Sequence, residues 1–209
     1  MANPSSFFFF LTAAAIFAIT PGPGILYIFT RSLKGGRREG TMSAIGTAAG
    51  GAGHVVVVAL GLSTVLATSV AVFNILKYAG AVYLVYLGIR ALRYSGESRP
   101  SVSAEPVTTA RVFFQGFMNE VLNPKTPLFF LAFIPQFIDP GGVVIVQFMA
   151  LGFISVLLNL IADLLVATLV GPIGQRLTTS AQFRNGQRVV SGWTLIGLGA
   201  YIAAGGQKQ

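Results

Sequence analysis

Five ionisable side chains lie inside stretches of the chain that are otherwise apolar. They are His54, Lys77, Glu120, Lys125 and Asp163. Ionisable residues in apolar spans are costly unless they face a partner, a polar cavity or a transport pathway. Asn159 lies four residues before Asp163 and therefore shares its face of a helix. We expect Asp163 and Glu120 to face a cavity, where at least one of them takes up a proton.

Structural roles stay open for the same residues. Glu120 could instead pair with an arginine of a nearby loop, and Asp163 could neutralise Lys125. The only histidine, His54, could titrate near neutral pH, but a hydrogen-bonded structural role is the preferred interpretation.

Two proline-containing motifs interrupt the apolar stretches. The first is TPGPG, residues 20–24, and the second is NPKTP, residues 123–127. Proline lacks a backbone N–H and clashes with the preceding turn, so a helix should break at each motif. In hydrocarbon, unwound backbone persists only where protein or a water-filled cavity satisfies its polar groups. A break in the middle of the membrane is therefore a candidate binding site.

Each break would expose two kinds of backbone group. The N–H groups that begin the new helix suit a carboxylate, and the carbonyl groups that end the preceding one suit an ammonium group or another cation. Together they match a zwitterion. The alternative is a proline kink that only shapes packing.

The composition indicates which elements hold these residues. The chain is 54% hydrophobic and only 10% charged, against roughly 25% charged for a soluble domain. No charged side chain occurs in residues 1–30, and residues 40–76 carry only the possible charge on His54. Uncharged apolar runs of about 18 residues or more are typical of spanning helices. The start of the chain lacks the basic segment of a secretory signal, so we interpret it as a retained first span.

The sequence therefore predicts an all-α integral membrane protein with about six transmembrane helices. The spans that satisfy hydropathy and charge are 7–30, 41–63, 69–92, 112–138, 143–170 and 189–204. Basic residues cluster at 31–38, 90–111 and 176–188, just beyond apolar spans. By the positive-inside rule these clusters are cytoplasmic, which places both termini on the outer face of the cell inner membrane. The net charge of +8 then reflects topology and contact with the lipid bilayer, and no nucleic acid partner is expected.

One segment, residues 95–110, has the composition of a linker, rich in Ser, Pro and Thr. It divides the chain into a first three-helix repeat (1–94), a cytoplasmic linker (95–110) and a second three-helix repeat (111–209). Since three is odd, two such repeats would be inverted relative to each other, and each would begin with a broken helix. Matched breaks in inverted repeats are typical of transporter binding sites.

Longer motifs carry a family resemblance. TPGPG followed by RSLKGGRREG resembles the signature of the lysine exporter (LysE) superfamily, in its homoserine and threonine efflux branch. LKYAGAVYLVYLGIRALR and FFQGFMNEVLNPKTPLFFLAFIPQFIDP are similar to its third-span and fourth-span signatures, so the resemblance covers nearly the whole chain. It implies an inner-membrane secondary carrier that exports amino acids or close derivatives and is commonly thought to be proton-driven. One departure is Gly24, where the family often has Asn.

The resemblance extends residue by residue to both breaks. Together with their neighbours, the candidate substrate-binding residues are Pro21, Gly22, Pro23, Gly24, Asn119, Asn123, Pro124 and Lys125. Lys125 would neutralise a substrate carboxylate, or hold Asp163 when the site is empty. The expected mechanism is alternating access around a cavity between the breaks, with a proton returning through Asp163 or Glu120. No cofactor and no metal site is expected.

Other classes of function are weaker or remain alternatives. A serine hydrolase would need a Gly-x-Ser-Gly element, but VVSGW has Val189 where Gly is required; an aspartyl hydrolase would need a second buried Asp, so we expect no enzyme. An exporter of a metal ion or another small solute remains possible through oxygen ligands, because the chain has no cysteine and one histidine. A passive channel or a non-transporting membrane subunit is the remaining alternative. Gly46, Gly50 and Gly53 recur at helical spacing, which predicts close helix packing and makes a homodimer reasonable.

Overall fold

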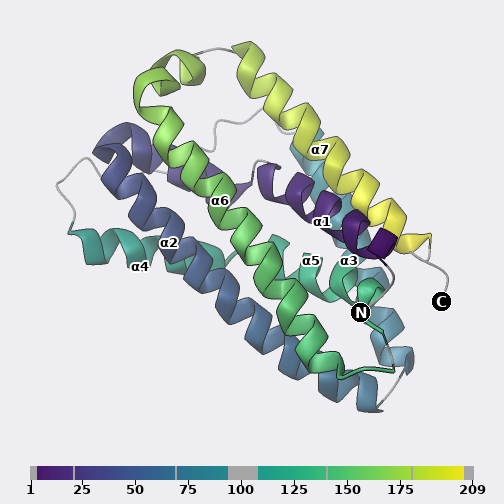
Figure 1. Ribbon diagram of the computed structural model, residues 1–209. Helices are drawn as coiled ribbons and strands as arrows, with labels where there is room; N and C mark the ends of the chain where they lie inside the picture. The colour runs from purple at the N-terminus through teal and green to yellow at the C-terminus, as the bar shows by residue number, and fades with distance from the viewer. Residues whose placement is uncertain are drawn as a thin grey trace.

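The computed structural model describes residues 4–20, 22–68, 70–93, 108–139, 141–179 and 181–204. Within these ranges every regular element is helical, which confirms the all-α prediction (Figure 1). The elements are α1 (Pro4–Ile19), α2 (Pro23–Thr68), α3 (Val70–Arg93), α4 (Thr109–Val121), α5 (Lys125–Phe133), the 3-10 helix η1 (Ile134–Phe137), α6 (Val144–Thr179) and α7 (Ala181–Ala203).

α2 consists of two helical segments joined at Gly36. This residue has φ 70° and ψ −170°, a conformation that glycine adopts without steric cost. Arg31 and Glu39 are eight residues apart in sequence yet form an ion pair of 3.1 Å across this joint, whereas eight residues of straight helix cover about 12 Å. The chain therefore turns back at Gly36, as Figure 1 shows, and α2 supplies the end of the first predicted span and the whole of the second.

The other helices follow the predicted spans. α3, α6 and α7 correspond to the third, fifth and sixth, while α4, α5 and η1 together form the fourth. By length and composition, three helical stretches in the described ranges are apolar enough to cross a membrane, namely Pro23–Gly61, Asn74–Arg93 and Val144–Val170. The first and fourth spans are assembled from shorter pieces because both are broken. Nearly all of the predicted linker 95–110 lies outside the described residues, so the division into repeats stays a prediction.

The packing brings helices of the two halves together. α2 lies against α4 and α6, α3 lies against α7 and α5, and α1 lies against α6. Phe9 near the start of α1 and Tyr201 near the end of α7 have ring centroids 5.0 Å apart. The two described ends of the chain therefore lie at the same end of the bundle, as an even number of spans requires. Arg188, from a predicted basic cluster, lies about 13 residues before Tyr201 in α7, roughly 20 Å away along the helix.

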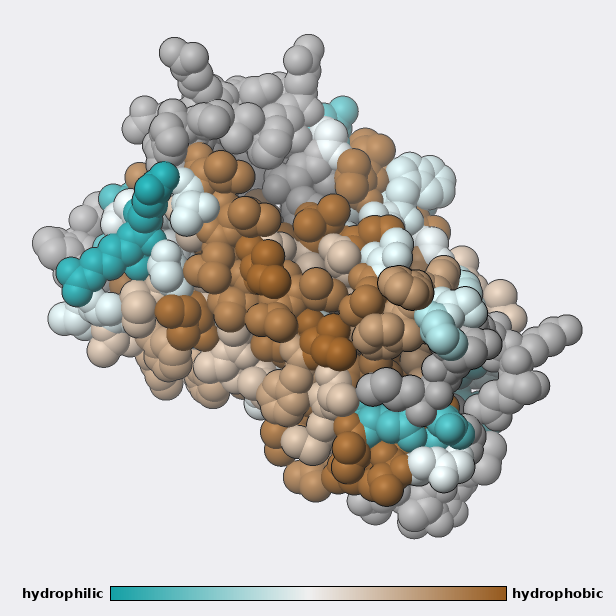
Figure 2. Space-filling model, viewed as in Figure 1, coloured by the Kyte–Doolittle hydropathy of each residue, from teal (hydrophilic) through white to brown (hydrophobic). Residues whose placement is uncertain are grey.

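The surface is apolar over a broad band. Figure 2 shows hydrophobic residues across the middle of one face, with hydrophilic residues toward its ends. The most exposed large apolar side chains include Phe8, Val57, Ile75, Val82, Val143 and Trp193, each more than 60% exposed. Such a surface suits hydrocarbon rather than water, since exposing apolar side chains to lipid chains carries no free-energy penalty. The chain is thus a multi-pass membrane protein.

Close packing of α2 on α4 depends on glycine. A Cβ atom on Gly50 would lie 2.9 Å from the carbonyl oxygen of Phe117, and one on Gly46 would collide with the carbonyl of Phe113. Both positions confirm the predicted packing face. Gly53 was predicted to belong to the same face, but no atom of another described helix lies within 4 Å of its Cβ position, so this part of the predicted face has no partner helix among the described residues.

Candidate functional site

The first break lies between α1 and α2. α1 ends at Ile19, and its last turn is closed locally, since the Thr20 amide donates to the Phe17 carbonyl (3.2 Å) and the Thr20 hydroxyl donates to the Ile16 carbonyl (2.6 Å). The carbonyl of Thr20 itself accepts a hydrogen bond from Lys125 Nζ at 3.1 Å. The break therefore ends in a carbonyl group whose partner comes from the other half of the chain. Pro21 lies outside the described residues.

The second break lies between α4 and α5 and is closed from within. Asn123 Nδ2 donates to Glu120 Oε2 (3.1 Å), while Asn123 Oδ1 accepts from the backbone N–H of Lys125 (3.1 Å). The backbone N–H of Asn123 also donates to the backbone carbonyl of Glu120 at 2.9 Å. Asn123 thus caps α5 and fixes the Glu120 carboxylate at the same time. Pro127 falls in the first turn of α5, where a helix tolerates the missing N–H.

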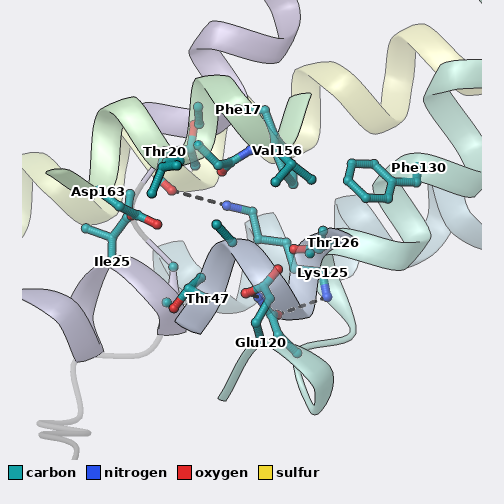
Figure 3. A pocket seen from close by; sticks show the side chains of 18 residues that line it. Phe17, Thr20, Ile25, Thr47, Glu120, Lys125, Thr126, Phe130, Val156 and Asp163 are labelled. Carbon is teal, nitrogen blue, oxygen red and sulfur yellow. Dashed lines mark hydrogen bonds between the residues drawn. The ribbon is translucent and has the colours of Figure 1, made fainter. Parts of the chain in front are cut away.

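A small cavity lies between the two breaks (Figure 3). Its volume is ≈ 40 Å³, which leaves room for a few water molecules at about 10–15 Å³ each. Its walls come from α1, α2, α4, α5, α6 and the break before α2. The predicted residues among its lining are Gly22, Gly24, Glu120, Asn123, Lys125, Asn159 and Asp163. The structure therefore gathers both predicted carboxylates and the lysine around one space.

Three predicted residues lie outside this lining. Pro23 and Pro124 are exposed and do not border the cavity. Asn119 does not border it either, although its Nδ2 atom is buried, has no hydrogen-bond partner among the described residues and lies 4.0 Å from the Cβ position of Gly24. The prolines break the helices, but the polar groups that face the cavity belong to the residues next to them in sequence.

Lys125 reaches across the cavity from the start of α5. Figure 3 shows its side chain ending at the Thr20 carbonyl, with Asp163 and Glu120 pointing toward the same space. Its Nζ also lies 4.2 Å from the centre of the Phe17 ring, a favourable position for a cation. Phe17 in turn stacks on Phe129 with ring centroids 3.8 Å apart.

Asp163 is the least satisfied of the three charged groups. It is 4% exposed, and no hydrogen bond or ion pair joins its carboxylate to another described residue. Lys125 borders the same cavity but forms no ion pair with Asp163 at contact distance and bonds to Thr20 instead. The predicted contact between Lys125 and Asp163 is therefore not formed in this structure, although both residues border the cavity.

Glu120 lies beside the N-terminal end of α2. Its Oε2 atom is 3.6 Å from the Cβ position of Gly24, in the first turn of that helix. Its backbone carbonyl oxygen is 2.9 Å from His54 Nε2, and because a carbonyl only accepts, this nitrogen carries a proton. The hydrogen-bonded interpretation of His54 is confirmed. Both ends of the first break therefore meet charged side chains of the second break, the ammonium of Lys125 at the carbonyl end and the carboxylate of Glu120 near the N–H end.

A second buried polar cluster, the Arg31 cluster, consists of Tyr27, Arg31, Glu39 and Gln115. Arg31 is 2% exposed. It donates to the Tyr27 hydroxyl (3.2 Å), to Glu39 (3.1 Å) and to Gln115. The Tyr27 hydroxyl donates to Gln115 at 3.3 Å. The cluster joins both segments of α2 to α4, about 10 Å beyond Gly24 along the helix.

Sequence reasoning missed several of these residues. Phe17 and Phe130 line the cavity, and Phe17 lies one turn before the first break, a spacing that could have indicated it. Gln115 and Tyr27 had no signal of this kind. Arg31 was assigned to a basic loop cluster, whereas the helix continues past it and buries it.

The sequence of the chain is related to a known family of membrane proteins. The chain matches the family described as "LysE type translocator" over residues 15–206. The chain belongs to the LysE family. This confirms the resemblance carried by the two breaks and by the third-span and fourth-span motifs.

Curated relatives of this LysE-family chain include exporters. It is 32% identical over 170 residues to the homoserine/homoserine lactone efflux proteins of Salmonella typhi and of Salmonella typhimurium, with 81% of each chain covered. It is also 29% identical over 199 residues to an uncharacterized membrane protein of Bacillus subtilis, with 91% of this chain and 94% of the relative covered. No solved structure matches the chain.

Proposed function

We propose that this protein is a secondary carrier that exports amino acids or close derivatives across the inner membrane, coupled to protons and working by alternating access. The observation that carries the proposal is the cavity where the two breaks meet, bordered by one buried lysine and two buried carboxylates. Family membership and the efflux function named for the Salmonella relatives support it.

The cavity's chemistry suits a small polar substrate with an amino group and a carboxyl or ester group. A carbonyl group and an aromatic ring contact Lys125 Nζ, and two carboxylates border the same cavity; these groups would hold an ammonium group. The backbone N–H groups in the first turn of α2 would hold a carbonyl or carboxylate oxygen. At ≈ 40 Å³ the cavity of this structure has less room than an amino acid needs, so the substrate would bind to a more open conformation.

Two clusters of side chains flank the cavity on opposite sides. Toward the start of α1 lies an aromatic cluster that includes Phe17, Phe129 and Phe133, all buried. Toward the turn of α2 lies the Arg31 cluster. In the proposed orientation, with both termini outside, the aromatic cluster is the outer closure and the Arg31 cluster the inner one. Opening them in turn gives the cavity access to each side.

The packing supports two inverted repeats. The second segment of α2 corresponds to α6 in this scheme, and α3 corresponds to α7, and each helix packs against its counterpart. The broken spans, α1 with α2 and α4 with α5, contribute their breaks to one cavity. Such an interface is where transporters with inverted repeats bind substrate and coupling ion.

Asp163 and Glu120 are the proposed coupling groups. The Asp163 carboxylate is buried and has no hydrogen-bond partner among the described residues, so its charged form is costly. Binding a proton removes this cost, and opening the cavity to water lowers it. A carboxylate in this position can therefore take up a proton on one side of the membrane and release it on the other.

The test is efflux from proteoliposomes loaded with labelled homoserine, homoserine lactone, threonine or lysine, with and without an imposed proton gradient. The proposal expects gradient-dependent efflux of one or a few of these solutes. Asp163→Asn or Glu120→Gln should remove the response to the gradient, while Asp139→Asn, outside the cavity, should keep it. An amide variant that keeps both transport and its pH dependence would exclude that carboxylate.

The alternatives predict different results. Absence of efflux of every solute by folded protein would favour another solute or a non-transporting subunit. For a metal ion the described residues offer no group of three or more His, Asp or Glu side chains placed as ligands. The family relationship likewise indicates a transporter rather than an enzyme.

A further inference from the structure

We infer that Lys125 is a built-in substitute for the substrate's ammonium group: it occupies the ammonium subsite while the carrier is empty, and the substrate's own ammonium group displaces it. This inference rests on the proposed export function. It assigns the subsite, the feature of the substrate that the subsite recognises and a role for Lys125 in the return of the empty carrier.

The subsite is the space around Lys125 Nζ. The Thr20 carbonyl accepts one of its protons at 3.1 Å, at the end of α1 where the helix dipole is negative. The face of Phe17 lies 4.2 Å away, and stacking on Phe129 holds that ring in place. A carbonyl oxygen, an aromatic face and nearby carboxylates are the groups that bind a primary ammonium ion.

Lys125 fills this subsite incompletely. An ammonium group has three donors, and the hydrogen bonds of the described residues account for one of them, to Thr20. The Asp163 carboxylate borders the same cavity without accepting any hydrogen bond from the described residues. The lysine is tethered to α5, whose first N–H is held by Asn123. An untethered ammonium group can reach both acceptors, so a substrate can compete with the lysine for the subsite.

The empty carrier needs a cation at this place. Without Lys125, two carboxylates and a helix end would face one another in a cavity of ≈ 40 Å³ with no positive charge between them. Leaving buried charges uncompensated is strongly unfavourable. Lys125 removes this cost when no substrate is bound, so the carrier can return to its loading side. With substrate bound, the substrate's ammonium group does the same and Lys125 moves aside.

This role defines the substrate class by its amine. Homoserine and its lactone share a free ammonium group but differ in the carboxylate, which the lactone has converted to an ester. Both can displace Lys125. An N-acetylated derivative has no cationic nitrogen and cannot. Unlabelled homoserine should therefore compete with labelled homoserine for transport from the same side of the membrane by the wild-type protein. N-acetylhomoserine at the same concentration should not compete.

The decisive experiment compares net efflux with exchange in proteoliposomes that contain the full chain and labelled homoserine. Net efflux into substrate-free buffer requires the empty carrier to return, whereas exchange against external homoserine does not. In Lys125→Met the ratio of net efflux to exchange should fall about tenfold or more, because a buried charge partner is lost. Lys77→Met, a matched loss of lysine outside the cavity lining, should leave the ratio at its wild-type value.

Chemical restoration guards against a variant that fails to fold. The chain has no cysteine, so Lys125→Cys introduces the only thiol. Alkylation with 2-bromoethylamine forms a C–S bond, releases bromide and rebuilds an ammonium side chain of lysine length, whereas bromoethane adds an uncharged group. Restoration of net efflux by the first reagent and not by the second is the expected result.

Three outcomes would overturn the inference. One is an unchanged ratio in Lys125→Met. Another is equal restoration by both reagents. The third is parallel loss of efflux and exchange in Lys125→Met, with both returning together on aminoethylation, which would mean that Lys125 binds the substrate directly. Wild-type protein that shows neither efflux nor exchange of any amino compound would instead refute the proposed function, and this inference with it.

Discussion

The two breaks have similar sequences but are completed in different ways. In the second break, Asn123 bonds to Glu120 and to the N–H of Lys125, residues three and two positions away. In the first break, the Thr20 carbonyl bonds to Lys125, which is 105 residues away. The second break is therefore satisfied by its own segment, while the first is satisfied only when the two halves of the chain are together.

This difference suggests a structural role for the second break and a binding role for the first. A locally satisfied break keeps its shape when the helices around it move. A break whose polar groups depend on a distant side chain can exchange that side chain for a ligand with the same chemistry. The second break thus carries the charged side chains Glu120 and Lys125, and the first break carries the carbonyl of Thr20 that accepts the hydrogen bond of Lys125.

The largest effect is expected from removing the local cap of the second break. Asn123→Ala deletes two hydrogen bonds at a buried position and leaves Glu120 and the N–H of Lys125 without this partner, which should cost about 2–4 kcal/mol of stability. Thermal unfolding in detergent measures the loss. Asn119→Ala is the matched control, since the Asn119 Nδ2 atom has no partner among the described residues. Equal destabilisation by the two variants would contradict the conclusion that the hydrogen bonds of Asn123 stabilise the second break.

An intermediate effect is expected from adding a methyl group at the first break. In Gly22→Ala the new Cβ would lie 3.3 Å from Lys125 Nζ, so Nζ must move by a few tenths of an ångström, which should weaken its hydrogen bond to the Thr20 carbonyl at a cost of about 1 kcal/mol. Net efflux should fall several-fold. In Gly24→Ala the nearest atom, Glu120 Oε2, is at an ordinary 3.6 Å, so a smaller change is expected. The reverse order would show that the lysine position is not critical.

The smallest effect is expected from the aromatic face of the ammonium subsite. Phe17→Leu keeps an apolar side chain but removes the ring beneath Lys125 Nζ, which should weaken binding of a cation there by about 0.5–2 kcal/mol. The half-saturating homoserine concentration in exchange should therefore rise. Phe137→Leu removes a buried ring of the same cluster that lies outside the cavity lining and controls for packing. If both variants shift the concentration equally, the ring acts only through packing.

The fold was largely predictable because its signals are local. Uncharged runs, basic clusters and two proline motifs were enough to predict an all-helical membrane protein and the positions where two spans break. The turn at Gly36 was predicted only as a boundary between spans. Its form, two helical segments joined with almost no loop, depends on a single glycine with positive φ.

The site was predictable in its members but not in its contacts. Glu120, Lys125 and Asp163 were recognised because buried charge is rare, and all three border the cavity. That Lys125 bonds to Thr20 depends on how two halves of the chain pack, which no local pattern contains. Pro23 and Pro124 were assigned to the site because they cause the breaks, yet a residue that breaks a helix need not touch what the break exposes.

The near absence of a loop at Gly36 also has a mechanical consequence. Arg31 and Glu39 join the two arms of α2 across this elbow, and Gly40 packs against Ser32. A movement of the short arm, which begins at the first break, would therefore carry the long arm with it, and the long arm packs against α4 and α6. Under the proposed function, a substrate bound beside Gly22 and Gly24 would therefore act, through the turn at Gly36, on the position of the long arm of α2.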